Sequence, residues 1–172
     1  MEFYLRDGRA EDAEQKGLVH FTSWKETYTG LMSKEYLEKL QLESCINSAR
    51  NYYQNNIVAI VDNLVVGFVG YLEDSRDISS IKPSSEIMSI YLLKKYQKKG
   101  IGYALMQEAL NRLTKKHITL FVLKDNFVAI NFYKKIGFKF TGHKIVQPII
   151  GDELIELEMV LEREDLVVTN LV

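Results

Sequence analysis

The chain is poor in the residues that build cross-linked or metal-stabilised proteins. It has a single cysteine, Cys45, and three histidines that lie far apart, His20, His117 and His143. One cysteine cannot form an internal disulfide, and a structural zinc site usually needs about four cysteine or histidine ligands. We therefore expect no disulfide and no metal site.

Long hydrophobic runs and a strong excess of charge are also missing. No stretch approaches the roughly 20 apolar residues of a membrane span, and residues 1–7 lack the basic start and apolar run of a signal peptide. These absences predict a cytoplasmic protein that makes no membrane contact. The formal net charge of −1 gives no overall field for a polyanion, which argues against nucleic-acid binding through local lysines.

Hydrophobic residues make up 47% of the 172-residue chain, enough for one domain with its own core. We place that domain at residues 1–164 and a C-terminal tail at 165–172. Apolar residues at helical spacing predict helices at 10–27, 33–40, 42–53, from 101 and from 127. Strand patterns occupy 3–5, 57–61, 65–72, 86–93, 118–123, 138–146 and 154–161.

The order of these elements predicts a mixed α/β sheet that is mostly antiparallel and is flanked by helices. Asp62 and Asn63 suit a tight hairpin turn between two of the strands. The strand at 118–123 follows the helix that begins at 101, which predicts a central parallel crossover.

A glycine-bearing turn, Gln97-Lys-Lys-Gly100-Ile-Gly102, lies between a predicted strand and a predicted helix. Such a turn presents free backbone N–H groups at the positive end of the helix dipole and can bind a phosphate, although it can also serve only to let a helix pack closely on a strand. A nucleotide P-loop would need Lys-Ser/Thr after the last glycine, where this chain has Tyr103. The dinucleotide fingerprint would need a third glycine at Leu105.

A second motif follows at Asn126-x-x-Ala129-x-x-Phe132-Tyr133-x-x-x-Gly137-Phe138. Together with Gln97-x-x-Gly100-x-Gly102, and in this order, it resembles the GCN5-related N-acetyltransferase superfamily. The resemblance is strong over residues 85–140 and weaker elsewhere. It implies an acetyltransferase that binds acetyl-CoA as its cosubstrate and needs no metal.

The resemblance also implies where acetyl-CoA binds. Backbone amides of the turn would hold the pyrophosphate, and the edge of the preceding strand would pair with the peptide-like pantetheine arm, with the N–H near Ile90 polarising the thioester. The lysines of the turn, and Lys135 near the adenosine phosphate, would equally suit solvated surface positions. The residues assigned to acetyl-CoA are Ile90, Tyr91, Leu92, Gln97, Lys98, Lys99, Gly100, Ile101, Gly102, Asn126 and Lys135.

Two side chains are the catalytic candidates. Tyr133 matches the position next to the thioester sulfur, where a phenol can protonate or hydrogen-bond the departing thiolate; its alternative is a packed helix tyrosine. Glu86 matches the glutamate that removes the amine proton in many relatives; its alternative is a solvated carboxylate at the strand entrance. Strand alternation predicts that Glu86 shares a face with Met88 and Ile90.

The acceptor is expected to be a primary amine that attacks the thioester directly in a ternary complex. The stretch at residues 23–31 resembles a subgroup that includes bacterial polyamine acetyltransferases, so a small amine or polyamine is favoured, and Trp24 and Tyr28 would line its site. A protein N-terminus or lysine side chain is the alternative acceptor. A non-catalytic acyl-CoA sensor is the alternative function, and a homodimer stays open.

Overall fold

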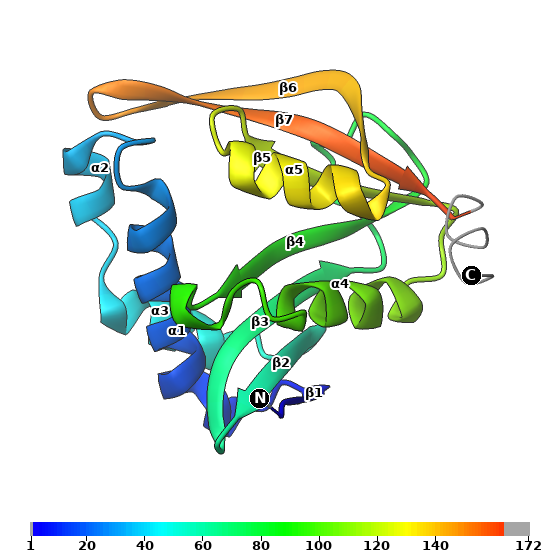
Figure 1. Cartoon of the computed structure of the whole chain (residues 1–172). Coiled ribbons are helices and arrows are strands. Elements are labelled where there is room, and N and C mark those ends of the chain that lie inside the picture. The colour runs from blue at the N-terminus through cyan, green and yellow to red at the C-terminus, as the bar shows by residue number, and fades with distance from the viewer. Residues whose placement is uncertain (1, 164–172) are drawn as a thin grey trace.

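Within the described residues, seven strands form one sheet in the order β1-β2-β3-β4-β5-β7-β6 (Figure 1). The computed structural model describes residues 2–163. Among the paired strands of the described residues only β4 and β5 run parallel, so the predicted mixed sheet with a central parallel crossover is confirmed. The strands are β1 Tyr4–Asp7, β2 Asn56–Val61, β3 Leu64–Leu72, β4 Ser84–Leu92, β5 His117–Leu123, β6 Lys139–Ile149 and β7 Asp152–Glu162.

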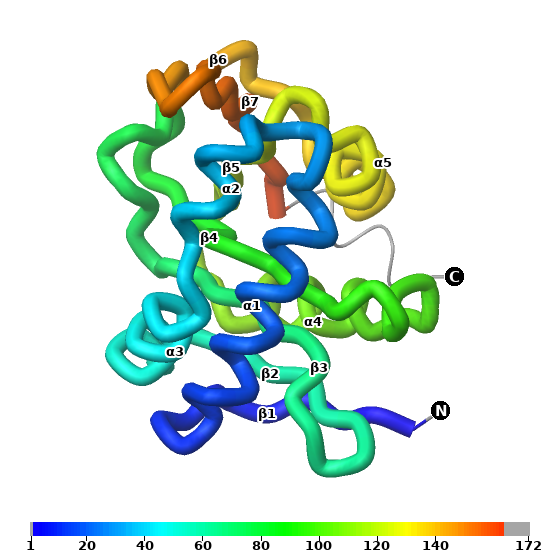
Figure 2. Tube along the Cα trace, turned by 90° about the vertical axis from the view of Figure 1, so that its left-hand side faces the viewer, coloured from blue at the N-terminus to red at the C-terminus, as the bar shows by residue number. Residues whose placement is uncertain are grey.

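Helices cover both faces of the sheet. Those of the N-terminal third lie on one face, and α4 and α5 lie on the other, as the two views of the chain show (Figures 1 and 2). A large core cluster packs under α4 and α5, and a smaller one joins Val19 of α1 to β2 and β3. The helices are α1 Ala13–Tyr28, α2 Lys34–Glu38, α3 Leu42–Asn51, α4 Ile101–Arg112 and α5 Phe127–Ile136, with short 3-10 turns at Ala10–Asp12 and Lys94–Tyr96.

The predicted hairpin turn at Asp62 and Asn63 is confirmed, and one strand pair is longer than predicted. Asp62 and Asn63 both have positive φ angles, 49° and 62°, as a tight hairpin between twisted strands requires. The strands β6 and β7 continue to a turn at Ile150 and Gly151, because Ile149 pairs with Asp152. The predicted strand at 138–146 thus extends through Pro148, which β6 accepts because it is an edge strand, where a missing N–H costs no sheet bond.

The predicted face of Glu86 is wrong, because β4 contains a β-bulge. Gly70 pairs with Ser89 and Tyr71 with Ile87, so Met88 is an extra residue. A bulge shifts the alternation by one residue. Ile87 and Ile90 therefore both pack against the α4 and α5 core, and Glu86 faces the side of the sheet that carries α1.

The predicted domain boundary at residue 164 and the predicted tail at 165–172 lie outside the described residues. Within residues 2–163, no helix combines the length and the hydrophobicity needed to cross a membrane. The same residues contain no group of three or more potential metal ligands.

A buried lysine on α1 should make stability depend on pH. Lys16 is 5% exposed, donates to the Tyr52 carbonyl at 3.2 Å, and lies 4.8 Å from the centroid of the Phe68 ring. Burial lowers the pKa of its amine to about 8, from 10.5 in the unfolded chain. Between these values the unfolded state binds more protons, so the unfolding free energy rises with pH, by about 3 kcal/mol for a shift of this size.

We expect Lys16→Met to remove this rise and to increase the melting temperature at pH 7. The Tyr52 carbonyl keeps a second donor, the Asn56 side-chain amide at 3.1 Å. Denaturant unfolding at several pH values checks the prediction, with Lys25→Met as the matched control, since Lys25 lies over the Phe21 ring on the same helix but is exposed. Equal pH profiles for Lys16→Met and the unmodified protein would contradict it.

Candidate active site

The outer half of β4 has a free backbone edge. On one side β4 pairs with β3 as far as Leu92. On the other it pairs with β5 only from Ser84 to Ile87, and the two strands then separate (Figure 1). Beyond Ile87, the edge that includes Ile90, Tyr91 and Leu92 has no strand partner among the described residues. An extended, peptide-like ligand can hydrogen-bond such an edge as an added strand.

The turn after β4 has the backbone geometry of an anion site. Lys98 and Gly100 have positive φ angles of 58° and 83°, and alternation of this kind turns successive N–H groups toward one point. Gly100 is the N-cap of α4 and provides no side-chain cap, so the N–H groups of Ile101 and Gly102 in the first turn remain available. The Gln97 side chain donates to the Leu92 carbonyl at 3.0 Å and so ties the turn to the end of β4.

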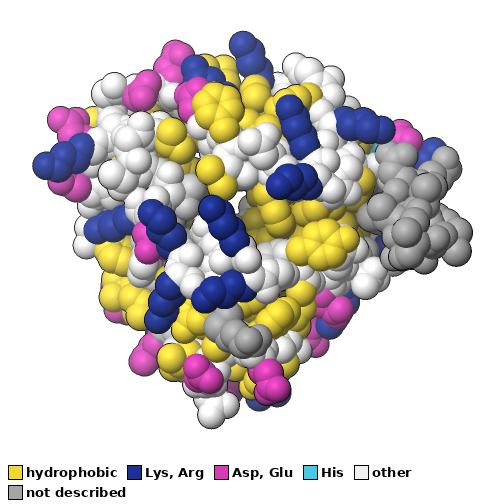
Figure 3. Space-filling view, viewed as in Figure 1, with side chains coloured by type: hydrophobic (Ala, Val, Ile, Leu, Met, Phe, Trp, Pro, Cys, Tyr) yellow, Lys and Arg dark blue, Asp and Glu magenta, His cyan; other side chains and the backbone are white. Residues whose placement is uncertain are grey.

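Basic side chains surround this turn. On the face seen in Figure 3, lysine and arginine side chains gather around a hollow near the middle of the molecule, over the connection from β4 to α4. Lys98 and Lys99 are both exposed, and the Lys99 amine lies 5.7 Å from the centroid of the Tyr96 ring. Their positive charge adds to that of the helix N-terminus.

The second motif begins at the helix cap of α5. Asn126 is buried, and its side-chain carbonyl accepts a hydrogen bond from the Ala129 N–H at 3.1 Å. This bond leaves the NH₂ group of Asn126 to donate elsewhere. Lys135, on the same helix, is exposed, and no described contact ties it to the turn before α4.

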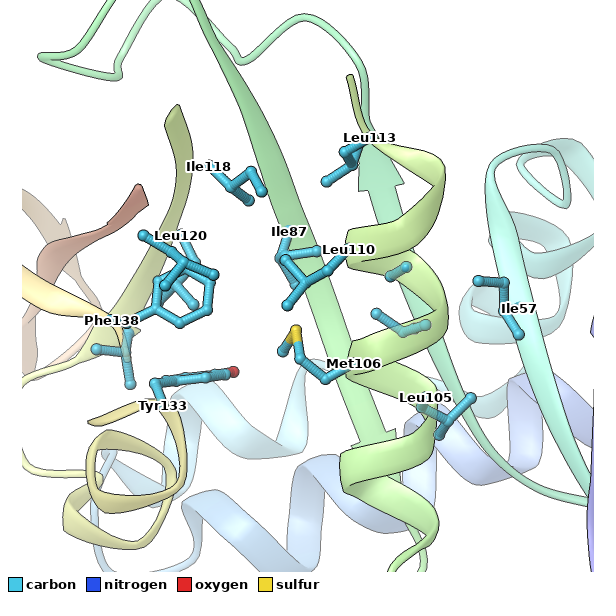
Figure 4. Close-up of a cluster of buried hydrophobic side chains, with 14 of the residues drawn as sticks. Ile57, Ile87, Leu105, Met106, Leu110, Leu113, Ile118, Leu120, Tyr133 and Phe138 are labelled. Atoms are coloured by element: carbon cyan, nitrogen blue, oxygen red, sulfur yellow. The ribbon is translucent and has the colours of Figure 1, made fainter. Parts of the chain in front are cut away.

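Tyr133 is buried, with its hydroxyl directed from α5 toward Met106 of α4 (Figure 4). Its ring contacts those of Phe132 and Phe138, with centroids 5.5 and 5.9 Å away. None of the described residues hydrogen-bonds the hydroxyl. Burial, with a smaller contribution from Tyr28, raises the pKa of the phenol. The group therefore stays protonated at neutral pH and is free to donate.

Glu86 is fully buried, and its carboxylate accepts hydrogen bonds from Arg76. The Arg76 side chain donates from Nε and from a terminal nitrogen to Oε1, at 3.0 and 2.5 Å, and the Arg76 backbone N–H donates to Oε2 at 3.0 Å. A carboxylate held in this way is poorly placed to remove a proton from a substrate amine. Arg76 comes from the loop between β3 and β4, which lies between two of the predicted strands.

The two predicted acceptor residues belong to an aromatic cluster between α1 and β4. The rings of Trp24 and Tyr28 meet edge to face, with centroids 4.7 Å apart, and the phenol groups of Tyr28 and Tyr91 interact. The indole N–H of Trp24 is buried without a hydrogen-bond partner among the described residues. The cluster thus forms one wall beside the free edge of β4.

Two further features were not visible in the sequence. Glu156 of β7 lies half-buried on the same side of the sheet as this wall, and its charge acts on Tyr28. The Ser33 hydroxyl donates to the Ile150 carbonyl at 2.6 Å and ties the loop before α2 to the tip of the β6–β7 hairpin. No local sequence pattern predicts either contact, because the partners lie far apart along the chain.

Comparison with known proteins decides the family. The family model described as "Acetyltransferase (GNAT) family" matches residues 19–138 of the 172-residue chain. The chain belongs to the GNAT acetyltransferase family. This GNAT chain is also 34% identical over 147 residues to the spermidine N(1)-acetyltransferase of Thermoplasma acidophilum, covering 81% of the chain and 89% of that relative. It is 28% identical to an N-alpha-acetyltransferase of Saccharolobus solfataricus, covering 80% of the chain and 81% of the relative.

Solved structures agree with this GNAT assignment. The PaiA N-acetyltransferase from Thermoplasma acidophilum, solved in complex with coenzyme A, superposes with a TM-score of 0.67 at 29% identity, over 94% of this chain and 99% of the other. The acetyltransferase yncA from Salmonella typhimurium, solved with acetyl-CoA, shares the fold with a TM-score of 0.70 at 16% identity, over 94% of each chain.

The site fits acetyl-CoA in its own geometry. The free edge of β4 suits the pantetheine arm, and the two positive-φ residues with the uncapped start of α4 suit the pyrophosphate. The GNAT chain is therefore an acetyl-CoA-dependent N-acetyltransferase.

Proposed function

We propose that the protein acetylates a small primary amine, with a polyamine favoured, by direct attack of the amine on the thioester in a ternary complex. The similarity to a spermidine acetyltransferase over 81% of the chain is the observation that supports this acceptor class most strongly. The acetyl group enters as the thioester of CoA, and the residues of the chain hold the two substrates and manage the proton of the leaving thiol.

Two groups of the chain would act on the thioester. The N–H of Ile90 on the free edge of β4 would donate to the carbonyl oxygen as negative charge develops. The Tyr133 hydroxyl would donate to the sulfur. Because a thiol has a pKa near ~8.5 and that of Tyr133 is raised above the phenol value of 10.0, we favour hydrogen bonding to the thiolate over full proton transfer.

Direct attack is supported by the state of the single cysteine. Cys45 lies on α3 and is 2% exposed, and burial raises the pKa of its thiol. A nucleophilic cysteine needs a lowered pKa and access to the substrate. An acetyl-cysteine intermediate therefore has no support, and the amine itself is the nucleophile.

Four acidic residues in loops and at a hairpin tip could attract a polycation, and the described residues compensate only part of their charge. Asp74 and Asp77 are paired with Lys115 and Lys82, at 2.7 and 3.8 Å. Asp152 and Glu153, at the tip of the β6–β7 hairpin, are exposed and form no ion pair with the described residues. The hairpin tip is thus the more negative part of the rim.

Steady-state kinetics with spermidine at two salt concentrations test the acceptor. We expect release of free thiol from acetyl-CoA, with a KM that rises with salt, because exposed charges are screened over about 8 Å at physiological ionic strength. Thiol release with a peptide or with another amine, but none at millimolar spermidine, would exclude polyamines. An N-terminal peptide is the first alternative to include, given the relative from Saccharolobus solfataricus.

A further inference from the structure

One cationic side chain and two carboxylates interact on the side of the sheet that carries α1. Arg76 is the cation, and both of its hydrogen-bonding nitrogens are directed at Glu86. Glu156 lies within electrostatic reach of both, but its carboxylate has no hydrogen bond or ion pair with any described residue. One cation thus serves two carboxylates, and one negative charge remains uncompensated.

The position of Glu156 links it to the acceptor side. It is the Cα partner of Leu123 on β5, beyond the point where β5 separates from β4 at Leu120. Its charge acts on Tyr28 of the aromatic wall. Glu156 therefore lies within electrostatic reach of the wall formed by α1.

The neighbouring carboxylate shows how this fold satisfies a buried charge when no ligand is needed. Glu158, two residues along β7, is 0% exposed, and it accepts hydrogen bonds from the hydroxyls of Ser79 at 2.7 Å, Thr141 at 2.8 Å and Ser80, as well as from the Ser80 N–H at 2.9 Å. Glu156 has none of these donors. Burial raises its pKa, which means that its charged form is poorly solvated and gains from a cationic partner.

We propose that Glu156 binds an ammonium group of the acceptor, namely one that is not acetylated, and thereby selects acceptors that carry a second positive charge. This inference rests on the proposed amine acetylation. The reacting nitrogen must lose its proton before it attacks, and a carboxylate in contact would hold it in the charged form. A second ammonium has no such requirement, and the ring of Tyr28, on which the charge of Glu156 acts, is of a kind that attracts cations.

The test compares two acceptors that differ by one charge. Cadaverine and pentylamine have the same carbon chain, and only cadaverine carries a second ammonium. We expect Glu156→Gln to raise the KM for cadaverine about 10- to 100-fold, the size of a hydrogen bond to a charged group, and to leave kinetics with pentylamine unchanged. Glu162→Gln, an exposed carboxylate at the opposite end of the same strand, is the matched control and should change neither substrate.

Equal behaviour of the Glu156→Gln and Glu162→Gln variants would overturn the inference. So would equal losses with both amines, which would indicate a structural role, especially with a lower melting temperature. Because Glu156 is unpaired, we expect the glutamine variant to melt at the same or a higher temperature. Calorimetric titration of cadaverine into the protein saturated with CoA gives a readout without turnover. Tighter binding of cadaverine by the unmodified protein than by Glu156→Gln supports the inference even if neither amine is acetylated. Absence of acetylation would refute only the proposed function.

Discussion

Tyr133→Phe should lower kcat by about 10²- to 10⁴-fold, the usual contribution of a positioned proton donor, while the affinity for acetyl-CoA stays nearly the same. The variant removes one hydroxyl that makes no hydrogen bond with the described residues and keeps the ring contacts with Phe132 and Phe138. Folding should therefore be preserved. Stopped-flow and steady-state measurements of thiol release, with calorimetric binding of acetyl-CoA, separate the effects.

Tyr52→Phe is the control for this result, because Tyr52 is 72% exposed and lies at the end of α3, away from the free edge of β4. It should leave turnover unchanged. If Tyr133→Phe also retains full turnover under conditions where chemistry limits the rate, the tyrosine is a packing residue. A protein that binds acetyl-CoA but never releases thiol with any acceptor would instead match the sensor alternative.

The second large effect is expected from Gly102→Val, which should weaken acetyl-CoA binding by at least about 100-fold, as loss of several charge-assisted hydrogen bonds implies. A side chain at Gly102 would meet Phe132 and Leu92 only at ordinary contact distances of 3.8 and 3.9 Å. The fold can therefore accept it, whereas the close approach of a phosphate to the backbone cannot. Gly100 is a less suitable target, because its φ of +83° would strain any other residue.

Asn111→Val provides the matched control, since it places the same side chain on an exposed position near the other end of α4. Calorimetric titration with acetyl-CoA and thermal unfolding should be measured for both variants. Unchanged affinity in folded Gly102→Val would remove the assignment of the turn as the pyrophosphate site.

Most of the fold follows from local patterns in the sequence, and the electrostatics of the site do not. Helical spacing, strand alternation and the Asp62-Asn63 turn depend on neighbours in the chain, so they predicted the elements and the parallel crossover. The ion pair of Arg76 with Glu86 depends on how a polar loop folds back over the sheet. Glu156 reaches the acceptor side only because β7 inserts between β5 and β6.

The roles assigned to individual residues remain predictions, and the geometry around these residues agrees with some of them better than with others. Gly100 and Asn126 sit where the motifs imply, with a positive φ and a helix cap respectively. For Glu86, the motif gave the position but could not reveal its arginine partner. Because Arg76 holds Glu86, a water molecule or another group is the better candidate for the base. Glu156 is a new candidate for binding the acceptor.

The bulge at Met88 has a consequence for changes in chain length. Because the side chains of a strand alternate between its two faces, deleting one residue here would turn Ile90 and Leu92 toward α1 and Tyr91 toward α4. The aromatic wall and the main core would exchange members while the free edge of β4 kept its backbone. Insertions and deletions between residues 87 and 92 should therefore not be tolerated, because this short stretch determines which side chains face the aromatic wall and which face the core.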